Sequence, residues 1–493
     1  MRTWKEFLRE ANYIDGQWVA ARSGETVAIT NPSTGEKLGT VPHSGTAEAR
    51  QAIEAASKCF ESWGKTTAQE RSKLIRALAD AALANRDALA ELLTREQGKP
   101  LAEARGEITI AAGYLHWFAE EATRVYGDII PSPWPGRRLL VTKEPVGVVG
   151  AITPWNFPSS MLARKFGPAL AAGCTVVAKP APQTPYSALA WAVLAEEVGF
   201  PAGVINIVTG DAQQIGGELT SSPLVSKITF TGSTPVGKLL MKQAADTVKK
   251  VSLELGGNAP FLVFDDADID SAVEGAIAAK FRNAGQTCVC TNRFYVQAGV
   301  YDHFVEKFSA AVAALKVGSP LEAGVVQGPL VDDRAVQKVE ELVADAKANG
   351  GNVTVGGYRH DLGLSYFQPT VIVDANHSMR MSKEEIFGPV AAIYSFERED
   401  EAIRIVNDTP FGLAAYFYSQ DLGRVMRVSE RLKYGIVAIN EGIVTTEFAP
   451  FGGVKESGIG SEGSKYGIQD YLNLKYICLG GLSDAPASVG AAR

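Results

Sequence analysis

The feature that most constrains the fold is a regular alternation of short apolar segments with helical segments, which begins near Gly147. Strands are expected at GVVGAIT, TVVAK, GVINIV, KITFT and KVSLEL, all within residues 147–255, with helices between them. The first of these helices is predicted over Pro158 to Ala172. Apolar strands separated by helices of about 10–15 residues are typical of βαβ units with a parallel sheet. This region is therefore predicted to be an α/β domain built on a parallel sheet.

A second α/β stretch is expected at residues 293–440, where RFYVQ, AAIYSF, AAYFYS and GIVAIN alternate with helical segments. The N-terminal part is expected to be mostly helical, at 47–60, 68–96 and 101–126. Two extended segments, RLLVTKEPV from residue 138 and YLNLKYICL from residue 471, belong to neither repeat. Because unpaired extended segments expose hydrogen-bonding edges that proteins usually cover, these two segments are expected to mediate assembly.

Composition disfavours several classes of partner. The chain has 493 residues, about three domains' worth of material, with 48 Lys and Arg against 55 Asp and Glu, a net charge of −7. Nucleic acids and anionic membranes need a dense basic face, so neither is an expected partner. The five cysteines show no framework spacing and the N-terminus has no apolar signal core, so a cytoplasmic protein is expected. Neither H-E-x-x-H nor paired C-x-x-C occurs, so no metal site is expected.

Two glycine-rich segments imitate nucleotide-binding motifs. GIGSEG at 458–463 spells G-x-G-x-x-G, but it does not follow a strand that opens a βαβ unit. GSTPVGKL at 232–239 nearly spells a triphosphate-binding loop, but Leu239 lacks the hydroxyl that would hold magnesium. The turn at Gly232 and Ser233, between KITFT and a helix with an early proline, aims free N–H groups at an anion and is a candidate pyrophosphate site. The alternative is an ordinary turn in which Ser233 caps the helix.

Three residues could carry covalent chemistry. Cys288 lies in the loop FRNAGQTCVC, where it is either a small buried residue or a thiolate stabilised by N–H donors. Glu254 ends an apolar strand, so it is either paired or kept for proton transfer with a raised pKa. Asn156 in TPWNFP follows a strand and precedes a helix that starts with proline, a position suited to an oxyanion donor.

The chain resembles the aldehyde dehydrogenase superfamily over about residues 10–480. The motifs that carry the resemblance occur in the family's order: PWNFP (154–158), KPAPQTP (179–185), FTGSTPVG (230–237), ELGG (254–257), GQTC (285–288), EEIFGP (384–389) and PFGGVKESG (450–458). The neighbourhoods VSLELGGNAPF, FRNAGQTCVC and EGSKYGIQDY look most like succinate-semialdehyde dehydrogenases and their relatives that oxidise glutarate semialdehyde.

The resemblance implies a fold and a mechanism. An NAD(P)-binding domain would comprise residues 1–137 and 147–255, a catalytic domain 256–465, oligomerisation strands 138–146 and 466–480, and a flexible tail 481–493. Cys288 would attack the aldehyde, Asn156 and the Cys288 N–H would hold the oxyanion, hydride would pass to the nicotinamide, and Glu254 would activate water to hydrolyse the thioester. The family also implies a homodimer or homotetramer.

The cofactor residues implied by the resemblance are Trp155, Asn156, Lys179, Pro182, Gly232, Ser233, Leu255, Glu385 and Phe387. At position 182, NAD-selective relatives often carry Glu, which repels a 2′-phosphate, and NADP-using relatives often carry Ser. Pro182 does neither, so NADP is expected to be accepted, and NAD stays open.

The substrate residues implied by the resemblance are Arg164 and Arg282, which would hold a distal carboxylate, and Thr445, where relatives tend to have Ser. An arginine by itself is more often a solvated surface residue. Another small aldehyde, such as betaine aldehyde or an aliphatic one, is the alternative substrate. Cys290, two residues beyond the nucleophile, is either a passive thiol or the partner in an inactivating disulfide with Cys288.

Overall fold

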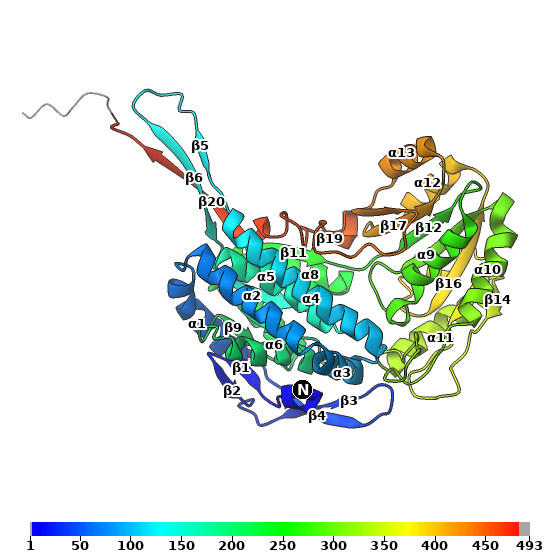
Figure 1. Cartoon of the computed structure of the whole chain (residues 1–493), viewed down its shortest axis with the longest axis horizontal. Helices are drawn as coiled ribbons and strands as arrows, with labels where there is room; N and C mark the ends of the chain where they lie inside the picture. The colour runs from blue at the N-terminus through cyan, green and yellow to red at the C-terminus, as the bar shows by residue number, and fades with distance from the viewer. Residues whose placement is uncertain (1, 483–493) are drawn as a thin grey trace, which may run out of the picture.

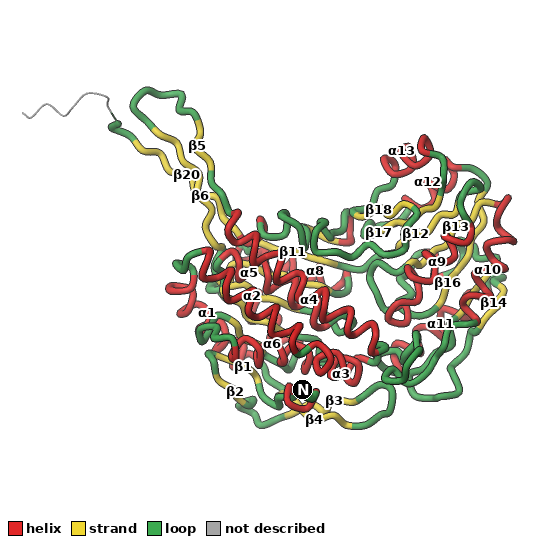
Figure 2. Tube along the Cα trace, viewed as in Figure 1, coloured by secondary structure: helices red, strands yellow, loops and turns green. Residues whose placement is uncertain are grey.

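Two large, mostly parallel sheets and a projecting three-stranded sheet organise the chain (Figure 1). The computed structural model describes residues 2–482, so the tail predicted at 481–493 lies, from residue 483 on, outside the described residues. Figure 2 shows the helices gathered around the two large sheets, with the three-stranded sheet standing away from the body.

The first sheet has the strand order β19-β11-β10-β7-β8-β9-β1-β2. Its five central strands run parallel, whereas β19, β1 and β2 are added antiparallel to their neighbours at the two ends. The bounds are β1 (Asn12–Ile14), β2 (Gln17–Val19), β7 (Val148–Ile152), β8 (Thr175–Lys179), β9 (Ile205–Ile207), β10 (Val225–Thr231), β11 (Lys250–Glu254) and β19 (Gly458–Ile459).

Eight helices belong to the part of the chain around this sheet: α1 (Thr46–Trp63), α2 (Ala68–Ala84), α3 (Arg86–Gln97), α4 (Leu101–Glu121), α5 (Pro158–Ala172), α6 (Pro185–Glu197), α7 (Ala212–Ser221) and α8 (Thr234–Ala244). The predicted range of α5 is confirmed. Pro158 fits its first turn because no intrahelical N–H is needed there, and Gly173, with φ of +94°, ends it in the left-handed region. Every residue of α5 is buried, because α4 and α2 cover it.

The second sheet has the order β14-β15-β16-β13-β12-β17-β18, with all but β14 parallel. Its strands are β12 (Ala259–Val263), β13 (Thr291–Gln297), β14 (Asn352–Val355), β15 (Thr370–Val373), β16 (Val390–Phe396), β17 (Ala414–Tyr418) and β18 (Ile436–Ile439). The helices are α9 (Ile269–Phe281), α10 (Tyr301–Ala313), α11 (Asp333–Ala348), α12 (Glu399–Asn407) and α13 (Leu422–Arg431). Two separate buried clusters pack on its faces.

The third sheet corrects one expectation. The segments predicted to lack a strand partner pair with each other, as β6 (Arg138–Pro145) against β20 (Leu472–Leu479), with β5 (Asp128–Ile130) on the far side of β6. This sheet extends from the body, with β20 and β5 as its two outer strands (Figure 1). The two segments lie outside both large sheets, as predicted, but they are not unpaired, and their role in assembly stays a prediction. Among the described residues, neither outer strand has a further partner strand.

The N-terminal prediction missed four strands. Besides β1 and β2, the hairpin of β3 (Thr26–Thr30) and β4 (Lys37–Pro42) precedes the first helix. These strands are short and mixed in polarity, so they give no clear periodic signal. One local signal existed: the Asp15-Gly16 pair, with both φ angles positive, is typical of a tight hairpin turn between β1 and β2.

Other boundaries also differ. The helix predicted over 68–96 breaks at Asn85. Strand β12 was not predicted, and β19 joins the first sheet although residues 256–465 were assigned to the catalytic domain.

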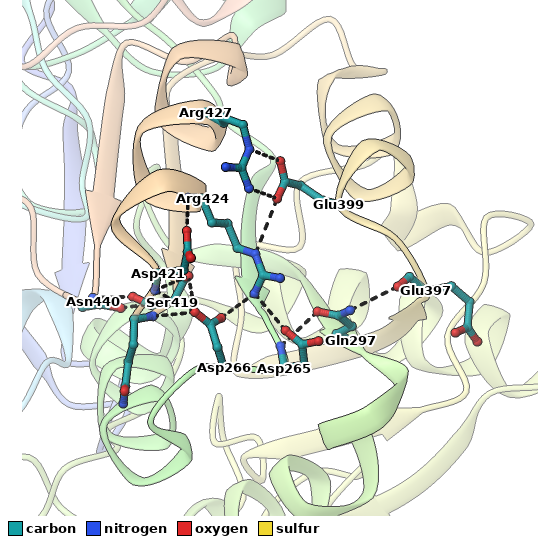
Figure 3. Close-up of polar contacts among 11 residues, drawn as sticks. Asp265, Asp266, Gln297, Glu397, Glu399, Ser419, Asp421, Arg424, Arg427 and Asn440 are labelled. Carbon is teal, nitrogen blue, oxygen red and sulfur yellow. Dashed lines mark hydrogen bonds and ion pairs between the residues drawn. The ribbon is translucent and has the colours of Figure 1, made fainter.

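An arginine near the end of the second sheet ties three elements together (Figure 3). The Arg424 guanidinium, from the first turn of α13, pairs with Asp265 at 2.8 Å and with Glu399 of α12 at 3.4 Å. Its charge also lies 4.8 Å from the ring centre of Phe264. The neighbouring Asp266 accepts hydrogen bonds from the backbone N–H groups at the start of α13. Residues far apart in the sequence thereby share one charge network.

We expect Arg424→Met to destabilise the part of the protein that is built around the second sheet. The Arg424 side chain is only 20% exposed and faces several carboxylates, so its loss should lower the apparent Tm by about 2–6 °C in a thermal scan. Arg427→Met is the matched control, because Arg427 contacts the same Glu399 but is 57% exposed, and it should shift Tm by less than about 2 °C. Equal shifts for the two variants would contradict this role of Arg424.

Candidate active site

Cys288 lies where two cavities meet. The strand-end cavity, of about 360 Å³, is lined by Pro154, Trp155, Asn156, Met161, Thr231, Gly232, Ser233, Glu254, Leu255, Gly256, Cys288, Arg334, Ala335, Lys338, Glu385 and Phe387. The arginine cavity, of about 260 Å³, is lined by Glu103, Gly106, Glu107, Ile110, Phe157, Ser160, Met161, Arg164, Arg282, Thr287, Cys288, Val289, Ile443, Thr445 and Phe451. Cys288 and Met161 are the residues that line both, so a group attached to the Cys288 sulfur can face either cavity.

The strand-end cavity follows from the order of the first sheet. Strands β7, β10 and β11 are neighbours, and their carboxyl ends lead to Asn156, Gly232 and Glu254. Parallel α/β sheets bind ligands beyond the carboxyl ends of their strands. Three of the residues predicted from separate motifs therefore come together at one sheet edge.

Glu254 is a buried carboxyl group with a perturbed proton affinity. It is 4% exposed, and its Oε2 accepts no hydrogen bond from the described residues. Burial, reinforced by the nearby Glu462 carboxylate, raises the pKa of Glu254 well above its usual value. A carboxyl group with a raised pKa beside a cavity is suited to proton transfer.

The Cys288 thiol lies in the loop after α9 and is partly exposed. Burial, followed by the Glu385 carboxylate, raises the pKa of Cys288 to about 12, while the Arg164 charge opposes the rise. The thiol form is thus favoured, mainly because burial makes a negative charge on the sulfur costly. Asn156 lies on the same cavity, and its Nδ2 donates to the Gln286 carbonyl at 2.9 Å. An amide nitrogen carries two N–H groups, so one remains for an oxyanion.

The Arg164 guanidinium lies against two aromatic rings in the arginine cavity. It lies 4.7 Å from the Tyr114 ring centre and 4.5 Å from that of Phe451, and the residue is 2% exposed. Its Nε and Nη1 make no hydrogen bond with the described residues, and the Glu462 carboxylate is 3.6 Å from Nη1. Arg282 is half-buried near Phe157, and its Nε also has no partner there. Buried cationic N–H groups without partners indicate a site for an anionic ligand.

The predicted cofactor residues mostly line the strand-end cavity. Trp155 and Phe387 meet edge to face with ring centres 5.5 Å apart. Glu385 Oε1 accepts from Gly257 N at 3.1 Å, and burial raises the pKa of Glu385 to about 7. Ser233 precedes α8 without capping it through its hydroxyl, contrary to the alternative of a serine cap. The first-turn N–H groups of α8 therefore have no side-chain cap, as a pyrophosphate site requires.

Two predicted cofactor residues do not line either cavity. Pro182 is exposed, and Lys179 is buried with its Nζ donating to the Pro180 carbonyl at 3.0 Å. Burial lowers the pKa of Lys179 to about 8, with a smaller opposing effect from Asp211. Their contact with a cofactor stays a prediction.

The two segments that resemble nucleotide-binding motifs, GIGSEG and GSTPVGKL, have structural roles. In GIGSEG, Gly458 and Ile459 form β19, and Gly458 lies opposite Glu254. Glu462 in the same segment accepts a hydrogen bond from Lys165 at 2.6 Å. In GSTPVGKL, the exposed Lys238 pairs with Glu456 at 2.8 Å.

Other residues were not anticipated from the sequence. Lys338 lines the strand-end cavity and donates to the Glu385 carbonyl at 2.7 Å. Glu103 and Glu107, one turn apart on α4, line the arginine cavity. The sequence does give a weak indication of Glu103 and Glu107, because acidic residues spaced by four on an otherwise buried helix face need partners.

Thr445 lines the arginine cavity, whereas Cys290 lines neither cavity. Cys290 is 6% exposed, its Sγ is 3.4 Å from the Lys280 carbonyl, and all five cysteines are free. Among residues 2–482, no group of three His, Cys, Asp or Glu could hold a metal ion. In the same range, every helix is too short or too polar to cross a membrane.

Comparison with known proteins places the chain in one class, the α/β oxidoreductases that act on aldehydes. The model of the aldehyde dehydrogenase family matches residues 18–477, and the chain belongs to this family. The resemblance noted in the sequence is thereby confirmed.

Three similar proteins illustrate the relationship. The chain is 59% identical to a glutarate-semialdehyde dehydrogenase of Pseudomonas aeruginosa, over 97% of this chain and 99% of that protein. It is 58% identical to the NADP-dependent succinate-semialdehyde dehydrogenase of Escherichia coli, over 96% and 98%. The crystal structure of a succinate-semialdehyde dehydrogenase from Burkholderia pseudomallei superimposes with a TM-score of 0.96 at 57% identity, covering 96% and 98% of the two chains.

Proposed function

We propose that the protein oxidises a short semialdehyde with a terminal carboxylate, succinate semialdehyde or glutarate semialdehyde, to the dicarboxylate with NAD(P). The observation that carries the proposal is that Arg164 and Arg282 open into the same cavity as Cys288. An aldehyde at the sulfur with its chain in this cavity would direct a distal carboxylate to two cationic groups, one of which has unpaired N–H donors on two nitrogens.

The residues of the strand-end cavity fit a nicotinamide cofactor. Gly232 and Ser233 at the uncapped start of α8 would hold the pyrophosphate, and Glu385 would hold the nicotinamide-side ribose, with Trp155 and Phe387 nearby. When bound, the cofactor supplies the hydride acceptor. The chain's own residues supply everything else in the reaction.

Cys288 gives up its proton to solvent and its sulfur attacks the aldehyde carbon, so a C–S bond forms, the C=O π bond breaks and the carbonyl oxygen becomes an oxyanion. The Asn156 amide and the Cys288 N–H stabilise that oxyanion. Collapse of the thiohemiacetal expels hydride and leaves a thioester. Glu254 then removes a proton from water, which attacks the thioester carbon, and the C–S bond breaks to release the acid and the Cys288 sulfur.

Both chain lengths remain part of the proposal. Gly106 lines the arginine cavity, and a Cβ built there would have no neighbour within 4 Å. Relatives with the two substrate names are almost equally identical to this chain, so identity does not choose between them. Betaine aldehyde is disfavoured as a substrate because its quaternary ammonium group would face two arginines.

For the cofactor, we propose that NADP is accepted and NAD remains usable. Pro182 carries no carboxylate that would repel a 2′-phosphate or accept from a ribose hydroxyl. Lys179 offers a cation whose charge is costly in the buried state and would be stabilised by a phosphate.

Assembly and regulation are further parts of the proposal. Residues 1–137 and 147–255 would form the NAD(P)-binding domain and 256–465 the catalytic domain, with the β6–β20 pair assembling a homodimer or homotetramer. The cysteine pattern fits a reducing, cytoplasmic setting. Cys288 and Cys290 would form an inactivating disulfide under oxidation, which thiol reagents should reverse.

We expect Glu254→Gln to stall the reaction at the thioester. Hydride transfer precedes water activation, so a rapid burst of reduced cofactor should be followed by a steady-state rate about 10²- to 10⁴-fold lower. In the parent enzyme, deacylation should accelerate as pH rises through the raised pKa of Glu254, because only the carboxylate accepts a proton. Stopped-flow absorbance at several pH values measures both effects. An unchanged steady-state rate would make Glu254 structural.

We expect Arg282→Gln to weaken selection of the distal carboxylate. Losing one hydrogen bond to a charged group costs about 1.5–3 kcal/mol, roughly a 10- to 150-fold drop in kcat/KM. The drop should appear with succinate semialdehyde and glutarate semialdehyde, and not with butanal, which has no carboxylate.

Measuring the same three aldehydes with Arg164→Gln provides a second test. Because the Arg164 charge also acts on Cys288 and Glu254, butanal oxidation should fall slightly in this variant while the semialdehydes fall much more. If butanal and the semialdehydes fall by one common factor in both variants, the arginines are structural and the substrate assignment fails.

A further inference from the structure

A buried ion pair from the helical layer reaches the segment that carries Asn156. Lys99, just before α4, and Glu107, within α4, have side chains that are 0% and 1% exposed, and their Nζ and Oε2 atoms are 2.6 Å apart. Both lie outside the βαβ units that build the strand-end cavity. The mechanism described above uses neither of them.

Lys99 contacts the two residues at the turn before α5. Its Nζ donates to the Asn156 carbonyl at 2.7 Å and lies 3.7 Å from the ring centre of Phe157. The Asn156 carbonyl also accepts from Asn283 Nδ2 at 3.0 Å. The backbone of Asn156 is thus fixed between the helical layer and the loop that leads to Cys288.

Glu107 supplies the cap that α5 lacks in its own sequence. Phe157 occupies the N-cap position and has no side chain able to accept a hydrogen bond. Glu107 Oε1 instead accepts from the backbone N–H groups of Ser159 at 2.9 Å and Ser160 at 3.1 Å. A carboxylate at a helix N-terminus is also favoured by the helix dipole.

The hydrogen bonds of the Lys99–Glu107 pair indicate what the pair does. Every hydrogen bond that the Lys99 and Glu107 side chains make outside the pair ends in residues 156–160. Burying two charges costs several kcal/mol each before their attraction is counted, and well-packed apolar residues could fill the same space. We propose that Lys99 and Glu107 are positioning residues that fix the backbone on both sides of Asn156, so that its amide meets the oxyanion formed at Cys288.

Ion pairing also makes Glu107 compatible with the proposed substrate. Glu107 lines the arginine cavity, where an isolated carboxylate would repel an anionic substrate. Lys99 cancels that charge at 2.6 Å. The pair can therefore hold the oxyanion segment without opposing the carboxylate selectivity of Arg164 and Arg282.

The inference rests on the proposed role of Asn156, and hydride transfer is the step to measure, because the oxyanion precedes it. Lys99→Met removes the bond to the Asn156 carbonyl but leaves a buried carboxylate, which can prevent folding. Lys99→Met/Glu107→Gln removes both charges and keeps an amide oxygen for the α5 cap, so it is the second variant.

We expect the double variant to slow single-turnover hydride transfer by about 10- to 100-fold, somewhat less than the loss of a whole oxyanion donor. Butanal should be affected as strongly as succinate semialdehyde, because the oxyanion is common to both. Cofactor affinity, measured by fluorescence titration, should change less than about threefold, since neither residue lines the strand-end cavity.

Arg71→Met is a matched control. Arg71 is also a buried cation of the helical layer, and its Nε donates to the Ala171 carbonyl at 3.0 Å, at the opposite end of α5. It should lower Tm as the Lys99 variants do, with hydride transfer within about twofold of the parent. Slowing of hydride transfer by Arg71→Met to the same degree would show a general effect of destabilising α5 and would overturn the inference.

A double-mutant cycle with Asn156→Ala completes the test. If the pair acts through the Asn156 amide, its loss should slow hydride transfer by less than about twofold once that amide is gone. An equal slowing in both backgrounds overturns the inference and leaves the proposed function standing. If Asn156→Ala itself leaves hydride transfer unchanged, the oxyanion role in the proposed function fails as well.

Discussion

The position of the candidate active centre depends on a buried ion pair. Lys165 on α5 donates at 2.6 Å to Glu462, which is 297 residues further along the chain, and also to Thr231 at the end of β10. Breaking such a buried pair costs about 3–5 kcal/mol, because the remaining charge has no solvent to stabilise it. The segment around Glu462 is thereby held at the sheet edge beside Glu254, so the position of the proposed base depends on residues far apart in the sequence.

The site also requires the two large sheets to assemble. Asn156 and Glu254 follow strands of the first sheet, whereas Cys288 and Glu385 belong to the region of the second. Hydrogen bonds cross between them, from Asn156 Nδ2 to the Gln286 carbonyl at 2.9 Å. Neither sheet alone holds the proposed nucleophile, oxyanion donor and base, so the proposed chemistry would take place between the two sheets. Because Cys288 lines both cavities, an aldehyde bound on one side would be able to pass hydride to an acceptor on the other.

The sequence predicted what depends on local pattern and on motif. The α5 range and the parallel direction of the strands around β7 agree with the structure. Trp155, Gly232 and Leu255, which were predicted to bind the cofactor, line the strand-end cavity. The short strands β1 to β4 were missed because their polarity follows no period. Lys99 and Glu107 were missed for another reason: the spacing of Glu103 and Glu107 shows that they need partners but not which ones, and only the fold places Lys99 and Glu107 against the segment that carries Asn156.

The electrostatic field at Cys288 bears on how product leaves. Burial and the Glu385 carboxylate raise the pKa of the Cys288 thiol to about 12, so negative charge is costly at this end of the arginine cavity. A semialdehyde brings its one charge to the opposite end, near Arg282, and is neutral at the sulfur. In the proposed reaction, the dicarboxylate product would carry a second charge at this end of the cavity, where burial makes charge costly, so hydrolysis would weaken its binding. The proposed oxyanion would meet the same cost earlier, and the Asn156 amide would stabilise it without adding a permanent cation that would retain the product.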